Sequence, residues 1–63
     1  MDLGKNIAKA RKNANLTQEQ LAEKLQVARQ TVSKWEAGTT MPTVPGLVKL
    51  AEALQTDCNS LLA

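Results

Sequence analysis

Side chains that can form directional hydrogen bonds are concentrated in the short stretch from Arg29 to Lys34. If this stretch is helical, Gln30 and Lys34 lie on one face, because they are four residues apart, and Arg29 and Ser33 flank them. Arginine, glutamine, threonine, serine and lysine are the residue types that reach base edges and phosphates in the DNA major groove. An ordinary helix with a solvated outer face would carry the same residue types, so the pattern alone leaves both interpretations open.

These side chains need elements that position them, and the surrounding sequence supplies two helices. Thr17 and Gln20 have the spacing of a capping box, in which a hydroxyl and an amide bind the free N–H groups at a helix start. Residues 18–25 are therefore predicted to be helical. After a short break, a second helix is predicted over about 28–37, and Gly38 ends it. Two short helices joined by a turn of three or four residues form a helix-turn-helix.

The other side of the second helix is predicted to pack inward. Ala28, Val32, Trp35 and Glu36 share this side. Trp35 is interpreted as a core residue rather than a stacking platform for bases, because it shares the face of Val32. It is the only aromatic residue in the sequence, so its loss is expected to weaken the core strongly.

Three further helices complete a predicted all-α, compact bundle of five short helices. The first spans about 3–13, and Asn15 suits the left-handed conformation in which many helices end. The last two follow predicted caps at Thr43 and Asp57. In chain order, the apolar stripes of these three helices are Leu3, Ile7, Ala10 and Ala14; Leu47, Val48, Leu50, Ala51 and Leu54; and Leu61 and Leu62. The final leucines either close the core or serve a dimer contact or a continuation of the chain.

Size and composition restrict the function. Sixty-three residues are predicted to form a single domain over 1–63, and a chain of this size buries only roughly 60% of its unfolded surface. Eight Lys and Arg against six Asp and Glu give a net charge of +2, so non-specific attraction to phosphates is expected to be weak. With no His, no Tyr and one Cys, the sequence offers few groups for acid–base or nucleophilic catalysis and no cluster of metal ligands. We therefore expect no enzyme activity, no cofactor and no metal.

The cellular setting follows from what the sequence contains. The single Cys58 fits a reducing compartment, and its position suggests packing rather than reactivity. No apolar run approaches the roughly 18 residues of a membrane span, and no signal peptide precedes the first helix. We expect a cytoplasmic protein without a membrane partner, and no small-molecule ligand is evident.

The chain resembles the phage-repressor and Cro-like (XRE-type) helix-turn-helix family of DNA-binding proteins. The matching motifs are Leu16-Thr17-Gln18, Leu21-Ala22, Val32-Ser33-Lys34-Trp35-Glu36, Leu50-Ala51 with Leu54, and Leu61-Leu62. Each motif alone would be weak, but together they cover nearly the whole chain. The resemblance implies a lambda-repressor-like fold whose 28–37 helix enters the major groove of double-stranded DNA.

The resemblance also implies roles for individual residues. Arg29, Gln30 and Lys34 match base-contacting positions of the family. Contacts to the DNA backbone, or flanking positions, are implied for Gln18, Thr31, Ser33, Thr39, Thr40 and Thr43. For Gln18 the alternative is a surface residue that only caps its helix. The loop over 39–43 carries no Lys or Arg, so its hydroxyls and backbone N–H groups would hold phosphate without an electrostatic clamp.

Arg11 matches a family arginine that pairs with the glutamate matching Glu36, behind the reading helix. The alternative is a surface arginine that merely suits the end of its helix. We favour the pair, because Glu36 falls on the Val32 face and a carboxylate there needs a partner or water. Arg11, Glu36, Trp35 and Val32 are thus predicted to be structural residues.

Three residues depart from the family pattern. Gln26 and Gln55 stand where glycine is usual, and a side chain in the left-handed region costs about 1 kcal/mol. Ala28 replaces the usual Ser or Thr cap of the reading helix, a loss of typically about 1 kcal/mol. The turn is therefore expected to be less stable than in most relatives, although the motif is retained.

Together these features predict sequence-specific binding of double-stranded DNA by a transcriptional repressor. Two copies are expected on an inverted repeat, as a homodimer with half-sites about 34–36 Å apart. Two alternatives remain open. A protein-interaction module would keep the fold and lose DNA binding, as the absence of Lys and Arg from the 39–43 loop suggests. An antitoxin would bind both a toxin and its own operator.

Overall fold

Five α-helices make up the regular structure of residues 2–63, the part of the chain that this computed structural model describes. They are α1 (Leu3–Asn13), α2 (Gln18–Leu25), α3 (Arg29–Ala37), α4 (Val44–Ala53) and α5 (Cys58–Leu62). The predicted all-α bundle of five short helices is confirmed. One boundary differs from the prediction, because Ala28 is extended and exposed and α3 begins at Arg29.

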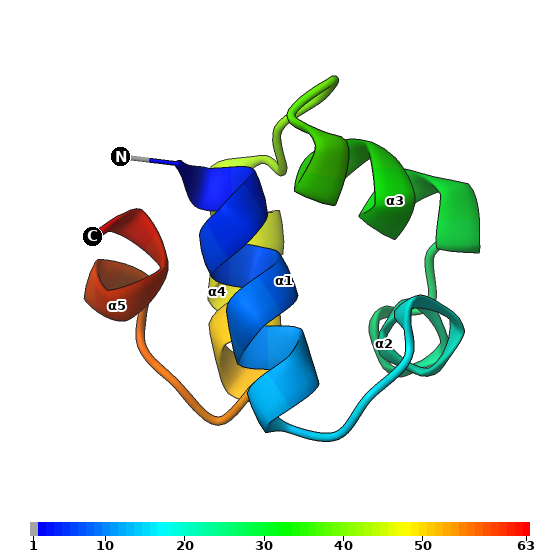
Figure 1. Cartoon of the computed structure of the whole chain (residues 1–63), viewed down its shortest axis with the longest axis horizontal. Helices are drawn as coiled ribbons and strands as arrows, with labels where there is room; N and C mark the ends of the chain where they lie inside the picture. Colours follow the sequence, from blue (N-terminus) through cyan, green and yellow to red (C-terminus); the bar gives the residue numbers. More distant parts are fainter. Residues whose placement is uncertain (1) are drawn as a thin grey trace.

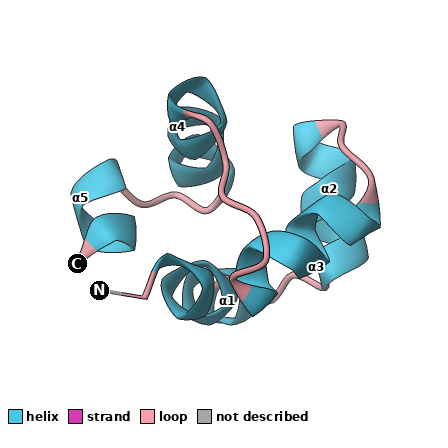
Figure 2. Cartoon of the chain, turned by 90° about the horizontal axis from the view of Figure 1, so that it is seen from above, coloured by secondary structure: helices cyan, strands magenta, loops and turns pink. Residues whose placement is uncertain are grey.

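The helices form a closed ring of contacts. α1 packs against α3 and α5, α2 packs against α3 and α4, and α4 packs against α5. In Figure 1, α1 runs through the middle of the view, with α2 and α3 on one side of it and α5 on the other. Figure 2 shows α1 and α4 on opposite sides of the ring. The buried core residues of all five helices form one cluster in the space that the ring encloses.

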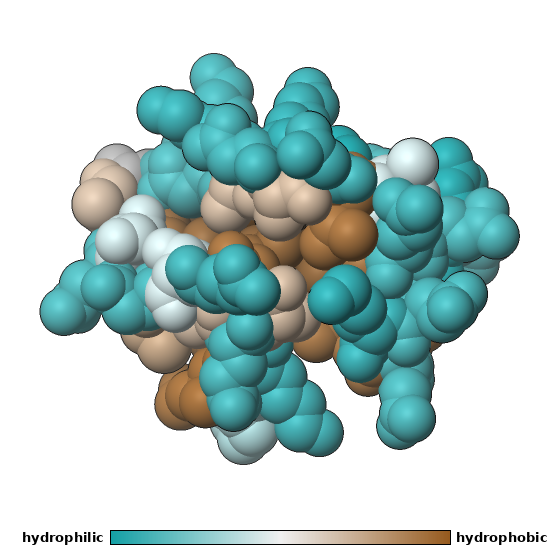
Figure 3. Space-filling model, turned by 90° about the horizontal axis from the view of Figure 1, so that it is seen from below, coloured by the Kyte–Doolittle hydropathy of each residue, from teal (hydrophilic) through white to brown (hydrophobic). Residues whose placement is uncertain are grey.

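Each helix sends one fully buried side chain into that space. These are Ile7 from α1, Leu21 from α2, Val32 from α3, Leu50 from α4 and Leu61 from α5. Smaller or partly buried apolar residues, including Leu3, Leu16, Leu25 and Leu47, pack around them. In the view of Figure 3, apolar surface lies across the middle of one face and hydrophilic side chains crowd its margins. No single helix can therefore be removed without exposing the common core.

Four side-chain caps hold the helix starts, three of them predicted (Thr17, Thr43 and Asp57) and one, Asp2, found in the structure. The side chains of Asp2, Thr17, Thr43 and Asp57 each accept a hydrogen bond from a backbone N–H three residues on. Thr17 and Gln20 form the complete capping box, with bonds of 3.0 and 2.8 Å. By contrast, Ala28 at the N-cap position of α3 provides no side-chain cap, as the sequence predicts.

Four helices end in the left-handed conformation. Asn15, Gln26 and Gln55 have φ angles of 60°, 58° and 56°, and Gly38 has a φ angle of 80°. Asparagine and glycine enter this region at low cost, whereas the two glutamines pay a steric penalty for their Cβ atoms. The left-handed geometry predicted at Gln26 and Gln55 is therefore present without the glycine that would favour it.

Some residues of the predicted apolar stripes lie outside the core. Ala14 and Ala28 are exposed, since both flank their helices rather than lying within them. Val48 is 46% exposed, so α4 buries a narrower face than the sequence suggests. Leu62 is 38% exposed, so of the two final leucines only Leu61 closes the core. None of the helices in residues 2–63 has the length and apolar character needed to cross a membrane.

Candidate nucleic-acid interface

The outer face of α3 presents polar side chains to solvent. Arg29, Gln30 and Lys34 are exposed, and Thr31 and Ser33 are half-buried beside them. Within the described part of the chain, neither Arg29 nor Lys34 takes part in an ion pair. Two positive charges and an amide on one short helix are thus free for an external ligand that offers acceptors and negative charge.

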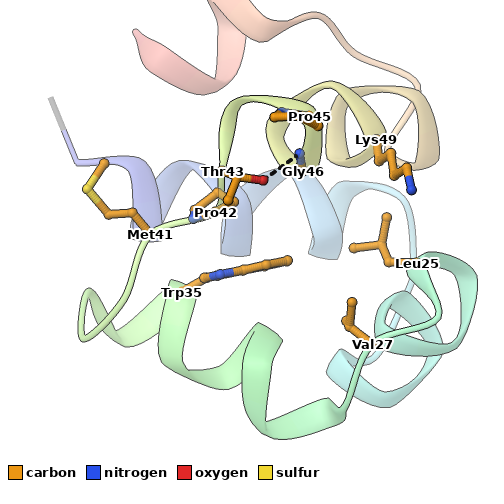
Figure 4. A pocket seen from close by; sticks show the side chains of 9 residues that line it. All are labelled: Leu25, Val27, Trp35, Met41, Pro42, Thr43, Pro45, Gly46 and Lys49. Atoms are coloured by element: carbon orange, nitrogen blue, oxygen red, sulfur yellow. Dashed lines mark hydrogen bonds between the residues drawn. The ribbon is translucent and has the colours of Figure 1, made fainter.

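The inner face of α3 fixes the helix to the core. Val32 is fully buried and Trp35 is 9% exposed, so Trp35 is a core residue as predicted. In Figure 4 the Trp35 ring lies edge-on along a groove between α3 and the start of α4, with Leu25 and Val27 at one end of the groove and Met41 and Pro42 at the other. The helix is therefore anchored by its apolar side while its polar side stays open.

An ion pair lies behind α3, on its inner side. Arg11 Nε donates to Glu36 Oε2 at 2.6 Å, and Arg11 Nη2 donates to Glu36 Oε1 at 3.1 Å. The two side chains are only 11% and 9% exposed. Such a paired, fork-like contact fixes both distance and orientation, so it ties the last turn of α3 to the end of α1.

Gln18 joins this pair from a third helix. Its Nε2 donates to Glu36 Oε1 at 3.0 Å, so the amide points into the protein rather than out to solvent. Arg11 also donates through Nη1 to the carbonyl oxygen of Leu16 at 2.8 Å. The carboxylate of Glu36 is thus bound by α1 and α2 together, and the loop before α2 is held by the same arginine.

These contacts set the protonation of Glu36. Burial raises the pKa of the carboxyl, but hydrogen bonds from Arg11 and Gln18, together with the charges of Arg11 and Lys12, lower it by more. The net pKa lies below that of an ordinary glutamate. The carboxylate therefore stays ionised at neutral pH and keeps its partners.

The loop between α3 and α4 offers fewer donors than the sequence suggests. Thr39, Thr40 and Thr43 are exposed. The N–H groups of Thr39 and Thr40, however, donate to the carbonyl oxygen of Lys34 at 2.9 and 3.4 Å, and the Thr43 hydroxyl accepts from Gly46 N–H. The expectation that backbone donors in this loop stay free is therefore wrong for Thr39 and Thr40, because the turn after α3 uses them.

Two residues that fix α1 against its neighbours, α3 and α5, were not identified from the sequence. Gly4 is buried where α1 crosses the end of α3, and Asn6 Nδ2 donates to the carbonyl oxygen of Leu61 at 2.8 Å. A glycine inside a predicted helix is a recognised sign of close backbone approach, so Gly4 carried a usable signal. Asn6 carried none, since its partner is a backbone carbonyl 55 residues away.

The chain matches a described family over most of its length. The model of the family described as "Helix-turn-helix" matches residues 7–61. The transcriptional activator BcrR of Enterococcus faecalis is 36% identical over 63 residues, which are 100% of this chain and 31% of that protein. The phage CTXphi transcriptional repressor RstR of Vibrio cholerae is 34% identical over 61 residues, 97% of this chain and 54% of that protein. The chain thus spans about a third to about half of these relatives.

Solved structures of similar chains have the same arrangement of helices. The biofilm regulator SinR in complex with DNA superposes with a TM-score of 0.89 and 31% identity, over 97% of this chain and 98% of that one. The P22 c2 repressor in complex with a synthetic operator gives a TM-score of 0.89 and 30% identity, over 97% and 92%. The likeness therefore extends over the whole fold and is not confined to α2 and α3.

Proposed function

The chain belongs to the helix-turn-helix family, and from that premise we propose that it binds double-stranded DNA sequence-specifically through the outer face of α3. The observation that carries the proposal is the division of α3 into two faces. Val32, Trp35 and Glu36 hold one face in place, while Arg29 and Lys34 on the other have charges that no described residue neutralises. A rigid helix with an unpaired polar face suits the directional contacts that base recognition requires.

We assign the contacts within this face by residue type. Arg29 suits guanine and Gln30 suits adenine, because each side chain can form paired hydrogen bonds with those bases, and Lys34 suits guanine. Thr31 and Ser33 flank these three base-contacting side chains. The DNA backbone would bind at the start of α2, at Gln18, and at the hydroxyls of Thr39, Thr40 and Thr43. No catalytic role is assigned to any residue.

The proposed regulator acts as a homodimer on an inverted repeat. One copy presents few base contacts, and a net charge of +2 gives little non-specific attraction, so a single copy binds weakly. Two copies related by a two-fold axis would read half-sites about 34–36 Å apart. We propose that this regulator represses transcription by occupying an operator. The similar proteins RstR and P22 c2 are both named repressors, and the P22 c2 structure contains a synthetic operator.

One observation favours a second candidate, a protein-interaction module with the same fold. The loop after α3 has no Lys or Arg, and two of its N–H groups are already used within the turn. Phosphate would therefore be held there by hydroxyls and the remaining N–H groups, without the N–H groups of Thr39 and Thr40 and without a positive side chain. The alternative predicts that the exposed residues of α3 tolerate substitution without loss of the partner.

Selection of bound sequences from a random duplex library, at two salt concentrations, tests the proposal. Enrichment of a palindrome would support DNA reading by two symmetric copies, and enrichment of a single half-site would keep DNA reading and reject the inverted repeat. Lys34→Ala should relax the enrichment at the base pair that Lys34 contacts. Lys9→Ala should leave it unchanged, because Lys9 is also exposed but lies on α1, outside the proposed interface. Failure to enrich any sequence with the wild-type chain would reject the proposal and favour the interaction module.

A further inference from the structure

We propose that Gln18 is a positioning residue that sets the orientation of the reading helix through Glu36. Its side chain would then affect which bases α3 prefers without itself touching DNA. This inference rests on the proposed DNA-binding function and deepens it, since it names a determinant of specificity outside the reading face.

The position of Gln18 in α2 leaves its side chain free for this task. Gln18 is the first residue of α2, directly after the Thr17 cap. The capping box is already complete with Thr17 and Gln20, so the helix start does not need the Gln18 amide. That amide instead crosses to α3 and donates to Glu36 Oε1 at 3.0 Å.

Glu36 is held from two directions. Arg11 approaches from α1 with two N–H groups at 2.6 and 3.1 Å, and Gln18 approaches from α2. The Arg11 fork fixes the carboxylate relative to α1 only. α3 packs against both α1 and α2. The hydrogen bond from Gln18 therefore adds a link between α3 and α2, and with both links in place the rotation of α3 relative to either helix is restricted.

Orientation of α3 matters more for discrimination than for bulk affinity. Hydrogen bonds to base edges are directional, and a binding constellation must be held to within about 0.5 Å and 10–20°. Contacts to phosphate tolerate larger displacements and carry no sequence information. Loss of the Gln18 contact should therefore reduce the difference between a correct and an incorrect base before it abolishes binding.

The backbone of Gln18 places the same residue beside the DNA. Its N–H belongs to the first turn of α2, where N–H groups have no acceptor within the helix. If a phosphate binds there, as proposed above, one residue joins backbone docking to the orientation of α3. Its side-chain effect and its backbone contact are separable, because substitution of the side chain leaves the N–H in place.

The experiment compares Gln18→Met with a matched control, Gln20→Met. Both remove a glutamine amide from α2 and keep the side-chain length, but the Gln20 amide bonds only the N–H of Thr17. Affinities of each variant are measured for the sequence selected by the wild-type chain and for single-base changes of it, together with the melting temperature. Gln18→Met should reduce the ratio of these affinities about tenfold, the effect of losing a hydrogen bond to a charged group. Gln20→Met should lower the melting temperature and leave the ratio unchanged.

The same substitution in a background without the carboxylate isolates the route through Glu36. In Arg11→Met/Glu36→Leu, Gln18→Met should have no further effect on the ratio, since there is no acceptor left for the amide. An equal loss of affinity for every sequence would overturn the inference and make Gln18 a direct phosphate contact. So would an unchanged ratio in Gln18→Met, or a full effect of Gln18→Met in the double-variant background. A wild-type chain with no preferred sequence would instead reject the proposed function, and this inference with it.

Discussion

Gly4 lies directly against the carbonyl oxygen of Glu36, where α1 crosses the last turn of α3. A Cβ atom at Gly4 would lie 2.6 Å from that oxygen and 2.7 Å from the carbonyl oxygen of Trp35. Real Cβ atoms do not approach backbone oxygens so closely, and backbone atoms cannot rotate away as a side chain can. The glycine and the Arg11–Glu36 pair therefore act on the same end of α3, one by allowing close approach and the other by fixing orientation.

Gly4→Ala is expected to lower the free energy of unfolding. Alanine would gain roughly 0.5–1 kcal/mol of helix propensity, but overpacking against the α3 backbone costs typically about 1–3 kcal/mol. The urea midpoint should therefore fall, and DNA affinity should fall with it, because α3 is displaced. Lys9→Ala on the exposed side of α1 should stay within about 0.5 kcal/mol. A midpoint at or above that of the wild type would show that α1 moves aside without strain.

Gln26→Gly is expected to stabilise the fold. Gln26 has a φ angle of 58°, and glycine would adopt this conformation without the Cβ clash, a gain near 1 kcal/mol. Part of this gain is offset by the greater freedom of glycine in the unfolded chain. Lys24→Gly is the matched control, since Lys24 is exposed and helical in the same element and should lose about 1 kcal/mol. Chemical denaturation of both variants measures these changes. A fall in the denaturation midpoint of Gln26→Gly would contradict the left-handed conformation at Gln26.

Gln30→Ala is expected to relax the preference at one base pair of each half-site. Loss of a paired contact to a base typically costs about 1–3 kcal/mol at that position. The melting temperature should hardly change, because Gln30 is exposed on the outer face of α3. Binding to the selected site and its single-base variants, measured at one salt concentration, checks both parts. An equal loss across all sequences would make Gln30 a phosphate contact.

The helices could be predicted from the sequence because their signals are local. Each predicted cap bonds an N–H only three residues further along the chain, as at Thr17, Thr43 and Asp57. The left-handed residues likewise lie within two residues of the end of a helix. The same locality explains the error at Ala28, where an apolar residue at helical spacing was included in a helix that starts one residue later. A cap residue at that position would have marked the boundary.

Contacts between helices were predictable only where burial or a family likeness supplied a reason. The Arg11–Glu36 pair is implied by the family resemblance and favoured by the position of the carboxylate on the Val32 face, and the structure confirms it. The amide of Gln18 was expected at the DNA backbone, and nothing in the sequence indicates that it turns toward Glu36 at 3.0 Å. Long-range polar contacts of this kind depend on how the helices cross, which spacing along one helix does not specify.

Acid should destabilise the fold through Glu36. Its pKa is lower in the folded chain than in an unfolded one, so the unfolded state binds more protons in that range. The stabilisation is complete above the ordinary glutamate pKa and is lost as the pH falls through the lower, folded value. Urea unfolding from pH 7 to pH 3 should therefore show a steeper loss for the wild type than for Glu36→Gln.

Asp57 is the control for this pH dependence. Hydrogen bonds from the backbone N–H and hydroxyl of Ser60 lower its pKa, so it contributes in the same direction at the α5 cap. Asp57→Asn keeps a good cap and removes the titrating group. The acid sensitivity that Asp57→Asn retains and Asp57→Asn/Glu36→Gln loses is assigned to Glu36. Equal pH slopes in the wild type and Glu36→Gln would show that the Glu36 carboxyl does not contribute.

The Arg11–Glu36 pair should couple stability to DNA binding. Both side chains are about nine-tenths buried, and removing one partner of a well-buried pair typically costs about 3–5 kcal/mol, because the other charge is left without solvent. Glu36→Ala should therefore destabilise the fold more than any substitution on the outer face of α3. It should also weaken DNA binding, although Glu36 faces away from the proposed interface.

Replacing both partners by apolar residues separates the stranded charge from the lost contact. Arg11→Met/Glu36→Leu should recover part of the stability lost in either single variant, because no uncompensated charge remains. Recovery should be incomplete, since the Leu16 carbonyl and the Gln18 amide both lose a partner in the double variant. Denaturation of the wild type, both single variants and the double variant forms a complete cycle, and the coupling free energy should lie above 0.5 kcal/mol. Single variants within about 0.5 kcal/mol of the wild type and strictly additive would mean that the two side chains act independently, which would leave Arg11 only as a cation that suits the end of α1.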